Sequence, residues 1–421
     1  MGNLLDRFIK YVKIDTTSIE EIGKIPSFEG ERELAIVLEQ ELKEIGAEDV
    51  EVTEDCFVFA TIPASEGYEN IKPIGLLAHL DTAADCPGKD VKPILHKKYD
   101  GGVLTINDSV DINPEQYPEI LRYIGEDIVT SDGTTLLGAD DKAGIAIIMD
   151  AAEELMKNDS IKHGKVRIAF TPDEEVSVGG ASIFDVEKFG AEIGVTVDGG
   201  GTGELSFETF NAYSYRVKIR GNNIHTAEAK GKLVNASTIA FEFDAMLPKF
   251  ERPEYTEGYE GFIHLCEIKG DVEEAYMDYI IRDFEKEGIE AKKKMMVDVA
   301  KQLNEKYNQE RVVLEGFMEY GNPRDEIVKH KNFIELIEEA YIASGVKPYN
   351  EPVRGGTDGS TLAEKGIACP NIFTAGFNFH SCREYVSVDG MQKSSNVIIE
   401  LVKRFAIKEN EKGKVNNEEK S

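Results

Sequence analysis

Two histidines and several carboxylates in this sequence could together bind metal ions. Imidazole and carboxylate groups are ligands that suit zinc, and two ions about 3.5–4 Å apart need one bridging carboxylate and roughly two further ligands each. The candidates occur in short groups far apart along the chain: His79 and Asp81, Asp140 and Asp141, Glu174 and Glu175, Asp198, and His380. The sequence therefore contains enough ligands for a centre of two metal ions.

One assignment gives each ion two ligands of its own and a shared third: His79 and Asp198 on one ion, Glu175 and His380 on the other, and Asp140 between them. Spacing alone does not separate Asp140 from Asp141 as the bridge. Glu174 is then left over beside the metals, where a carboxylate could act as general base towards water and return the proton to a leaving amine. Asp81 is spaced to orient the imidazole of His79 from behind.

Each group also has an ordinary structural interpretation. Adjacent glutamates could simply favour a helix start, Asp140 and Asp141 could cap a helix, and Asp198 beside three glycines could be a turn. The joint occurrence of suitable ligand types favours the metal centre. Their common position after apolar runs supports the same interpretation.

Those apolar runs predict the elements that would position the ligands. Residues 74–78, 166–170 and 193–197 are typical of buried strands that end at polar loops. Helical periodicity over residues 142–156, 333–342 and 391–405 alternates with strands. This order predicts an α/β fold with a mostly parallel sheet in the catalytic domain. Segments after the carboxyl ends of parallel strands gather at one sheet edge, where distant ligands could meet.

The pattern changes between residues 208 and 320. The order there approximates β-α-β-α-β, with a strand near 213–219, a helix near 235–246, a strand near 262–268, a long charged helix from about 272 to 307, a strand near 312–317, and a possible strand at 255–259. We interpret residues 208–320 as an α/β sandwich domain inserted into a catalytic domain of residues 1–207 and 321–407. The polar segment 408–421 is predicted to be disordered.

Composition excludes several classes of partner. A net charge of −31 repels nucleic acids and anionic membranes, so neither is expected to bind. No run of about 18 apolar residues predicts a membrane span, and the N-terminus resembles an amphipathic helix rather than a signal peptide. The five scattered cysteines predict reduced thiols and a cytoplasmic protein.

Eight segments, in order, resemble one enzyme family: AHLDTAADCPGK (78–89), TTLLGADDKAGIA (134–146), FTPDEEVSVGG (170–180), TVDGGGTGELSFETFNA (196–212), GYEGFIHL (258–265), YIIRDFEKE (279–287), RGGTDGS (354–360) and PNIFTAGFNFHS (370–381). From about residue 3 to 406 the chain is similar to the peptidase T family, the cytosolic zinc-dependent tripeptide aminopeptidases within metallopeptidase family M20. The resemblance implies two Zn²⁺ per subunit, the ligand set given above with Asp140 as the bridge, and Glu174 as general base. It also implies a homodimer, with the inserted domain as lid and dimerisation module.

The resemblance further implies a set of substrate-binding residues in or near the inserted domain. His225 would help to polarise the scissile carbonyl, and Arg282 and Arg354 would bind the peptide carboxylate through their guanidinium groups. Asn211 is a further candidate. The chain departs from the family after His225, with Thr-Ala-Glu-Ala, and after His380, with Ser-Cys-Arg-Glu. Both departures are expected to border the substrate groove.

Three functions therefore compete. The first is removal of the N-terminal residue from tripeptides by attack of a zinc-activated water. The second is a dipeptidase or N-acyl amino acid deacylase of the same clan, with the same ions and a different groove. The third is a catalytically silent protein that keeps the fold, which the complete ligand set and Glu174 argue against.

Overall fold

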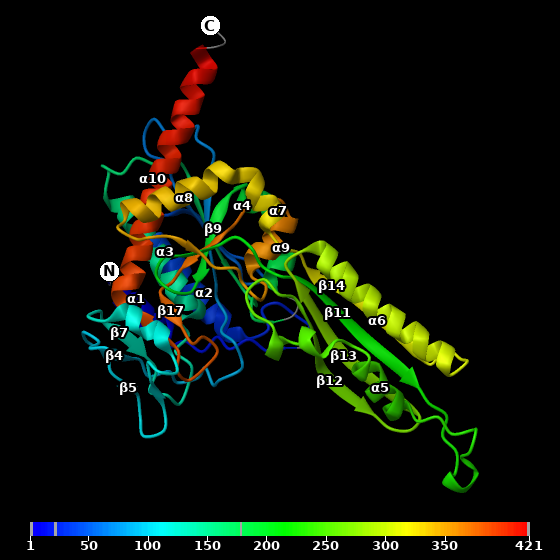
Figure 1. Cartoon of the computed structure of the whole chain (residues 1–421). Coiled ribbons are helices and arrows are strands. Elements are labelled where there is room, and N and C mark those ends of the chain that lie inside the picture. Colours follow the sequence, from blue (N-terminus) through cyan, green and yellow to red (C-terminus); the bar gives the residue numbers. More distant parts are fainter. Residues whose placement is uncertain (1–2, 21–22, 177–178, 419–421) are drawn as a thin grey trace. The chain divides into compact units, whose positions relative to one another are not determined.

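The computed structural model of the 421-residue chain describes residues 3–20, 23–176 and 179–418. The chain divides into two compact units (Figure 1). Unit 1 consists of Met1–Phe207, Asp325–Glu351 and Thr361–Ser421, and unit 2 consists of Glu208–Arg324 and Pro352–Ser360. The segment predicted as the inserted domain lies within unit 2, which also takes in the short return segment at residues 352–360.

Unit 1 contains a sheet of eight strands. In spatial order these are β1 (Glu48–Val52), β2 (Val58–Ile62), β8 (Val166–Thr171), β3 (Ile74–His79), β9 (Gly194–Gly199), β16 (Asn371–Phe373), β10 (Glu204–Ser206) and β15 (Tyr349–Asn350). The four central strands, β8, β3, β9 and β16, run parallel. Strands β1, β2 and β10 join the sheet through antiparallel pairings. The predicted α/β fold is confirmed, with the parallel part concentrated at the centre of a mixed sheet.

Apolar side chains on both faces explain why the central strands are buried. In β3, Leu76 belongs to the main hydrophobic core and its neighbour Leu77 to a second cluster on the opposite face. Strands covered on both faces read as continuous apolar runs. The helices lying wholly or largely in unit 1 are α1 (Leu4–Tyr11), α2 (Glu29–Ile45), α3 (Ala139–Lys157), α4 (Val186–Phe189), α7 (Arg324–Ile327), α8 (Lys331–Ala343), α9 (Asp358–Glu364) and α10 (Val388–Glu418).

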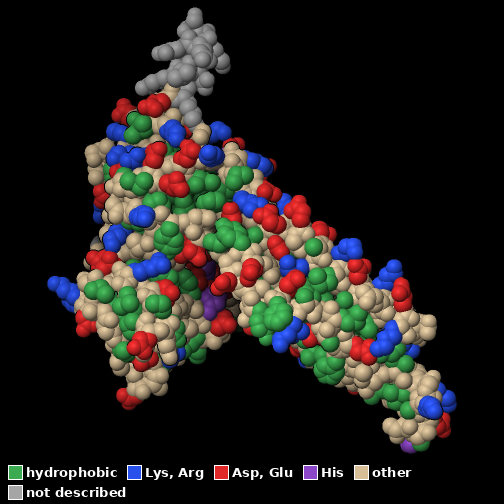
Figure 2. Space-filling model, in the orientation of Figure 1, with side chains coloured by type: hydrophobic (Ala, Val, Ile, Leu, Met, Phe, Trp, Pro, Cys, Tyr) green, Lys and Arg blue, Asp and Glu red, His purple; other side chains and the backbone are tan. Residues whose placement is uncertain are grey.

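The last helix differs from the prediction of a disordered tail. Helix α10 continues to Glu418 instead of ending near residue 407, and residues 419–421 lie outside the described residues. Glutamate and lysine are good helix formers, so this polar segment can extend a helix that is already anchored in the core. Among the described residues, no helix is both long and apolar enough to cross a membrane. Acidic and basic side chains are interspersed over the visible surface (Figure 2).

Unit 1 also contains small sheets that the sequence patterns did not predict. One has the order β17 (Gly376–Phe377), β18 (Tyr385–Ser387), β7 (Ile128–Thr130), β4 (Ile94–His96), and the other pairs β5 (Leu104–Thr105) with β6 (Asp111–Ile112). Strands of two or three residues are too short to show a periodicity. The first sheet matters for function, because β18 follows the loop that carries His380 and pairs with β7, the strand that precedes α3.

Unit 2 is an antiparallel sheet with two helices. Its sheet has the order β12 (Phe262–Gly270), β13 (Glu274–Asp283), β11 (Asn211–Arg220), β14 (Val312–Tyr320), and its helices are α5 (Ala236–Ala245) and α6 (Lys286–Lys306). Two predictions here are wrong. The helix predicted from residue 272 begins only at Lys286, because Met277, Tyr279 and Ile281 alternate into the core as in a strand. The strand predicted at 255–259 is absent, and a short 3-10 helix ends at Tyr255.

Candidate metal centre

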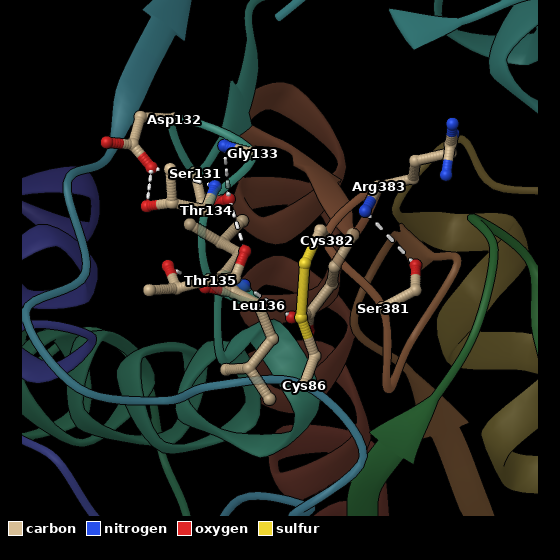
Figure 3. The surroundings of a disulfide bond; sticks show 12 residues. Cys86, Ser131, Asp132, Gly133, Thr134, Thr135, Leu136, Ser381, Cys382 and Arg383 are labelled. Carbon is tan, nitrogen blue, oxygen red and sulfur yellow. Dashed lines mark hydrogen bonds between the residues drawn. A yellow bond between two sulfur atoms is a disulfide. The ribbon is translucent and has the colours of Figure 1, made fainter. Parts of the chain in front are cut away.

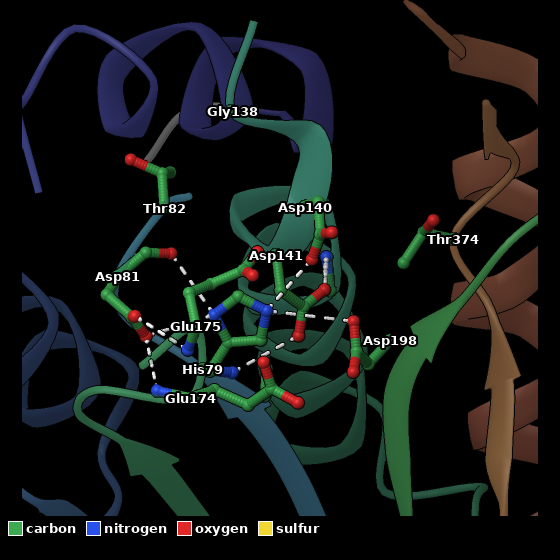
Figure 4. A network of polar contacts seen from close by, with 12 residues as sticks. His79, Asp81, Thr82, Gly138, Asp140, Asp141, Glu174, Glu175, Asp198 and Thr374 are labelled. Atoms are coloured by element: carbon green, nitrogen blue, oxygen red, sulfur yellow. Dashed lines mark hydrogen bonds and ion pairs between the residues drawn. The ribbon is translucent and has the colours of Figure 1, made fainter. Parts of the chain in front are cut away.

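The candidate ligands meet at the carboxyl end of the parallel strands in unit 1. His79 ends β3, Asp198 lies near the end of β9, and Glu174 and Glu175 follow β8. Figure 4 shows His79 between Asp81 on one side and Asp140 and Asp198 on the other. The sheet-edge arrangement expected from the strand pattern is therefore present.

Two sets of side chains share Asp140. His79 Nε2 lies 2.9 Å from Asp140 Oδ1 and 3.7 Å from Asp198 Oδ1. His380 Nε2 lies 3.3 Å from Asp140 Oδ2 and 2.9 Å from Glu175 Oε1. The two oxygens of Asp140 thus face different imidazoles, and each set could supply ligand atoms to one ion, since its atoms all lie within 4.8 Å of one another.

A close helix–strand contact brings Asp140 and Asp198 together. A Cβ atom on Gly144 of α3 would lie only 1.9 Å from the carbonyl oxygen of Val197 in β9. Only glycine permits this approach of the helix to the strand. The sequence therefore fixes the distance between the elements that carry these two carboxylates.

The electrostatics of the cluster suit divalent cations. Burial and the nearby carboxylates of Asp140 and Glu175 raise the pKa of Asp198 to about 7. Hydrogen bonds to Asp140 and Glu175 raise the pKa of His380 to about 11. The carboxylates therefore lie close enough to repel one another, and bound cations would reduce this repulsion. Two imidazoles with carboxylates form a donor set that fits zinc.

Buried carboxylates hold the backbone around these ligands. The Asp81 carboxylate accepts the N–H groups of Glu174 at 2.8 Å and Glu175 at 3.0 Å, and its Oδ1 lies 3.2 Å from His79 Nδ1. Asp141 is fully buried, and its Oδ2 accepts the backbone N–H of His79 at 3.2 Å. Asp141 therefore points away from the proposed bridging position and supports His79 instead.

Sequence reasoning missed a second supporting group, which lies behind Glu174. Glu31 of α2 accepts the backbone N–H of Asp173 at 3.0 Å, and Asp173 accepts the N–H of Ser27 at 2.8 Å. Burial and the charges of Asp81 and Asp173 raise the pKa of Glu31 to about 9. No local motif marks Glu31, because it lies more than 140 residues before its partner. Sequence reasoning also missed Glu384, which binds the backbone at Asp140.

The prediction of five reduced thiols is wrong for one pair. Cys86 and Cys382 form a disulfide with a Cα–Cα distance of 6.4 Å (Figure 3). Cys56, Cys266 and Cys369 are not part of a disulfide. The two cysteines are 296 residues apart, so only the fold brings them together. The bond joins the loop after β3 to the segment that carries His380.

The predicted substrate-binding residues lie in unit 2, where most are engaged with their own unit. Arg282 forms an ion pair with Glu319 at 2.6 Å. Arg354 donates to the backbone oxygens of residues 256, 258 and 260 and lies over the ring of Phe210. His225 is exposed, and its Nδ1 accepts the N–H of Ala227 at 3.2 Å.

Asn211, the fourth predicted substrate-binding residue, has its polar atoms engaged within unit 2. Its side chain is completely buried, its amide nitrogen donates to the backbone oxygens of Asp283 and Phe284, and its oxygen accepts the N–H of Asn322. With these contacts the side chain joins three segments of unit 2. These contacts fix the position of Asn211, and its role in substrate binding stays a prediction.

The fold and this cluster define a class of protein, and comparisons with known proteins agree. Residues 132–404 match peptidase family M20/M25/M40, and the chain belongs to this family. The predicted family and enzyme class are thereby confirmed. The chain is 48% identical to Peptidase T of Bacillus mycoides over 404 residues. This alignment covers 96% of this chain and 98% of that relative.

Two solved structures share the fold. Aminopeptidase PepT from Bacillus cereus matches with a TM-score of 0.73 at 22% identity, over 96% of this chain and 98% of that one. A dinuclear metal-binding peptidase of the M20 family from Bacillus subtilis matches with a TM-score of 0.63 at 15% identity. The match covers 95% of this chain and 96% of that one. At these identities the likeness supports the fold.

Proposed function

We propose that this protein is a dinuclear metallo-aminopeptidase that removes the N-terminal residue from tripeptides. The observation that carries the proposal is the position of Asp140, whose two carboxylate oxygens face His79 and His380. A carboxylate between two imidazoles is the arrangement that a two-metal hydrolase needs. Similarity to Peptidase T supports the choice of substrate.

The proposed ligands divide between two zinc ions. His79 and Asp198 would hold one ion, Glu175 and His380 would hold the other, and Asp140 would serve both. When bound there, zinc would supply the Lewis acidity that hydrolysis of an amide needs. Glu174 takes a proton from the attacking water and returns it to the leaving amine, while Asp81 holds the backbone of Glu174 and the imidazole of His79.

Unit 2 is proposed as the lid and dimerisation domain of a cytoplasmic homodimer. His225 is exposed and available to bind the scissile carbonyl. Arg282 and Arg354 remain candidates for the peptide carboxylate, although Arg282 must then exchange its ion pair with Glu319 for the substrate. The contacts of Arg354 also support the loop at residues 256–260, so a substitution there changes more than one interaction.

The test compares four peptides: a free tripeptide, the matching dipeptide and tetrapeptide, and the N-acetylated tripeptide. Each is incubated with and without a chelator, and products are identified by mass. We expect release of the first residue from the free tripeptide, loss of activity with chelator, and recovery with zinc. Preferred cleavage of the acetylated peptide would support a deacylase, and preferred cleavage of the dipeptide would support a dipeptidase.

A further inference from the structure

Glu384 binds the backbone beside the proposed bridging ligand. Its side chain is buried, with 1% of its surface exposed. One carboxylate oxygen, Oε2, accepts the N–H groups of Leu137 and Gly138, both at 2.7 Å. The other, Oε1, accepts the N–H of Asp140 at 3.0 Å. One side chain therefore satisfies three backbone donors at the start of α3.

These donors lie in an irregular stretch of backbone at the N-terminal end of α3. Asp140 and Asp141 have non-helical backbone angles, and the N-cap residue, Gly138, has no side chain to accept a hydrogen bond. Buried backbone N–H groups need an acceptor. Here the acceptor belongs to a residue 244 positions away from Asp140. The position of Asp140 thus depends on a distant part of the chain.

That distant part carries another proposed ligand. Glu384 lies four residues after His380, in the segment between β17 and β18. Its hydrogen bonds fix this segment to the backbone of Asp140, while His380 Nε2 lies 3.3 Å from Asp140 Oδ2. The same short segment therefore both supplies one ligand and holds the backbone of the next.

We infer that Glu384 is a positioning residue of the metal centre, which fixes the distance between Asp140 and His380. It touches no reacting atom and acts through the backbone of the bridging residue. The inference rests on the proposed dinuclear centre. Loss of such supporting hydrogen bonds typically weakens metal binding about 10- to 100-fold.

A carboxylate is required because all three partners are donors. In Glu384→Gln the amide offers a single acceptor oxygen, and its NH₂ group would face a backbone N–H. At least one buried donor then loses its partner. The variant keeps the size of the side chain, so the change is confined to hydrogen bonding. Glu384→Asp keeps the charge but shortens the side chain, and provides a milder second variant.

The control removes a carboxylate elsewhere in unit 1 that also accepts three hydrogen bonds. Glu41 accepts hydrogen bonds from the side chains of Arg7, Lys10 and Tyr11, all in or next to α1 and none of them a proposed metal ligand. Glu41→Gln should lower the stability of the protein without changing zinc binding. The metal-free variants are compared by thermal unfolding, which separates general destabilisation from a local effect.

The experiment measures zinc stoichiometry and affinity by competition with a chromogenic chelator, using the full chain. We expect Glu384→Gln to weaken the affinity for zinc at one or both sites about 10- to 100-fold. Glu384→Asp should have a smaller effect, and Glu41→Gln should bind zinc as the wild type does. Wild-type affinity in both Glu384 variants would overturn the inference, as would an equal loss in Glu41→Gln. If Glu384→Gln does not fold, Glu384→Asp decides the outcome.

The two proposals can fail separately. A wild-type protein that binds two zinc ions but does not cleave tripeptides would contradict the proposed substrate, and the role of Glu384 would still be decided by the affinities. A wild-type protein that binds no zinc would overturn both the dinuclear centre and the role of Glu384.

Discussion

The carboxylate of Asp81 accepts a hydrogen bond from the backbone N–H of Glu174 at 2.8 Å. The same carboxylate lies 3.2 Å from the Nδ1 atom of His79 and accepts the N–H of Glu175. Asp81 is completely buried, so solvent does not weaken these contacts. A single side chain therefore fixes a proposed metal ligand and the backbone of the proposed general base relative to each other.

Asp81→Asn should reduce kcat more than it changes KM. The amide has only one acceptor oxygen, so either a backbone N–H or the His79 imidazole loses its partner. We expect kcat for a tripeptide to fall about 10- to 100-fold. Steady-state kinetics measure this, with Asp150→Asn as control, because Asp150 accepts hydrogen bonds from Gln392 and Ser395. An equal effect of both substitutions would contradict the prediction.

Glu174→Gln tests the division between base and ligand. An amide cannot accept the proton from water, so kcat/KM should fall about 10²- to 10⁴-fold while zinc content stays at two per chain. Zinc content is measured by elemental analysis after dialysis. Glu174 could also join His79 and Glu175 in a ligand set. Loss of one zinc ion from this variant would therefore show that Glu174 is a ligand.

Removal of metal should lower the thermal stability of the protein. Burial and the charges of Asp140 and Glu175 raise the pKa of Asp198, and metal bound at the proposed centre would offset this crowding of negative charge in the folded chain. At a free concentration of 100 times Kd, a ligand stabilises the folded state by about 2.7 kcal/mol. Scanning calorimetry with chelator and with zinc measures this as a change in Tm. The Asp140→Asn variant, which lacks the proposed bridging carboxylate, should gain much less stability from zinc.

The disulfide predicts a specific pair of linked peptides. Digestion without reductant should yield a linked pair containing Cys86 and Cys382, which separates on reduction. Because a disulfide restricts the unfolded chain, reduction should lower stability by about 2–4 kcal/mol in the oxidised protein. Cys86→Ser should abolish both effects, whereas Cys266→Ser, at an exposed free thiol, should change neither. Unlinked peptides from protein kept under oxidising conditions would contradict the pairing.

The sequence predicted that distant candidate residues would meet, because several of them follow strong local patterns. The apolar runs before His79, Glu174 and Asp198 are strands of the parallel centre, and their order in the sheet brings these residues together. Periodicity predicted such elements well, since long buried strands and helices repeat over many residues. The helix predicted from residue 272 was wrong over β13, because charged residues between the apolar positions of this strand resembled a helical pattern.

Contacts between distant segments could not be predicted in the same way. Glu384 and Glu31 bind backbone N–H groups, and backbone groups carry no signature in the sequence. The Cys86–Cys382 bond depends on a 296-residue separation that only the folded chain closes. Residues that position the site are therefore found from geometry, while residues that could bind metal are found from their chemical type.

Glu41 should make the stability of the protein fall in acid. Although burial opposes its ionisation, hydrogen bonds from Lys10 and Tyr11 and the charge of Arg7 lower its pKa below 4.5. A group whose pKa is lowered by folding stabilises the protein above its unfolded pKa, and this stabilisation is lost as pH falls through the folded pKa. Below pH 4.5 the wild type should therefore lose stability more steeply than Glu41→Gln. Near pH 7 the variant should be less stable by about 2 kcal/mol, since hydrogen bonds to a charged group are lost.

Urea unfolding of both proteins at pH 7 and at several pH values below 4.5 measures the difference. A difference in unfolding free energy that is the same at every pH would contradict the lowered pKa of Glu41.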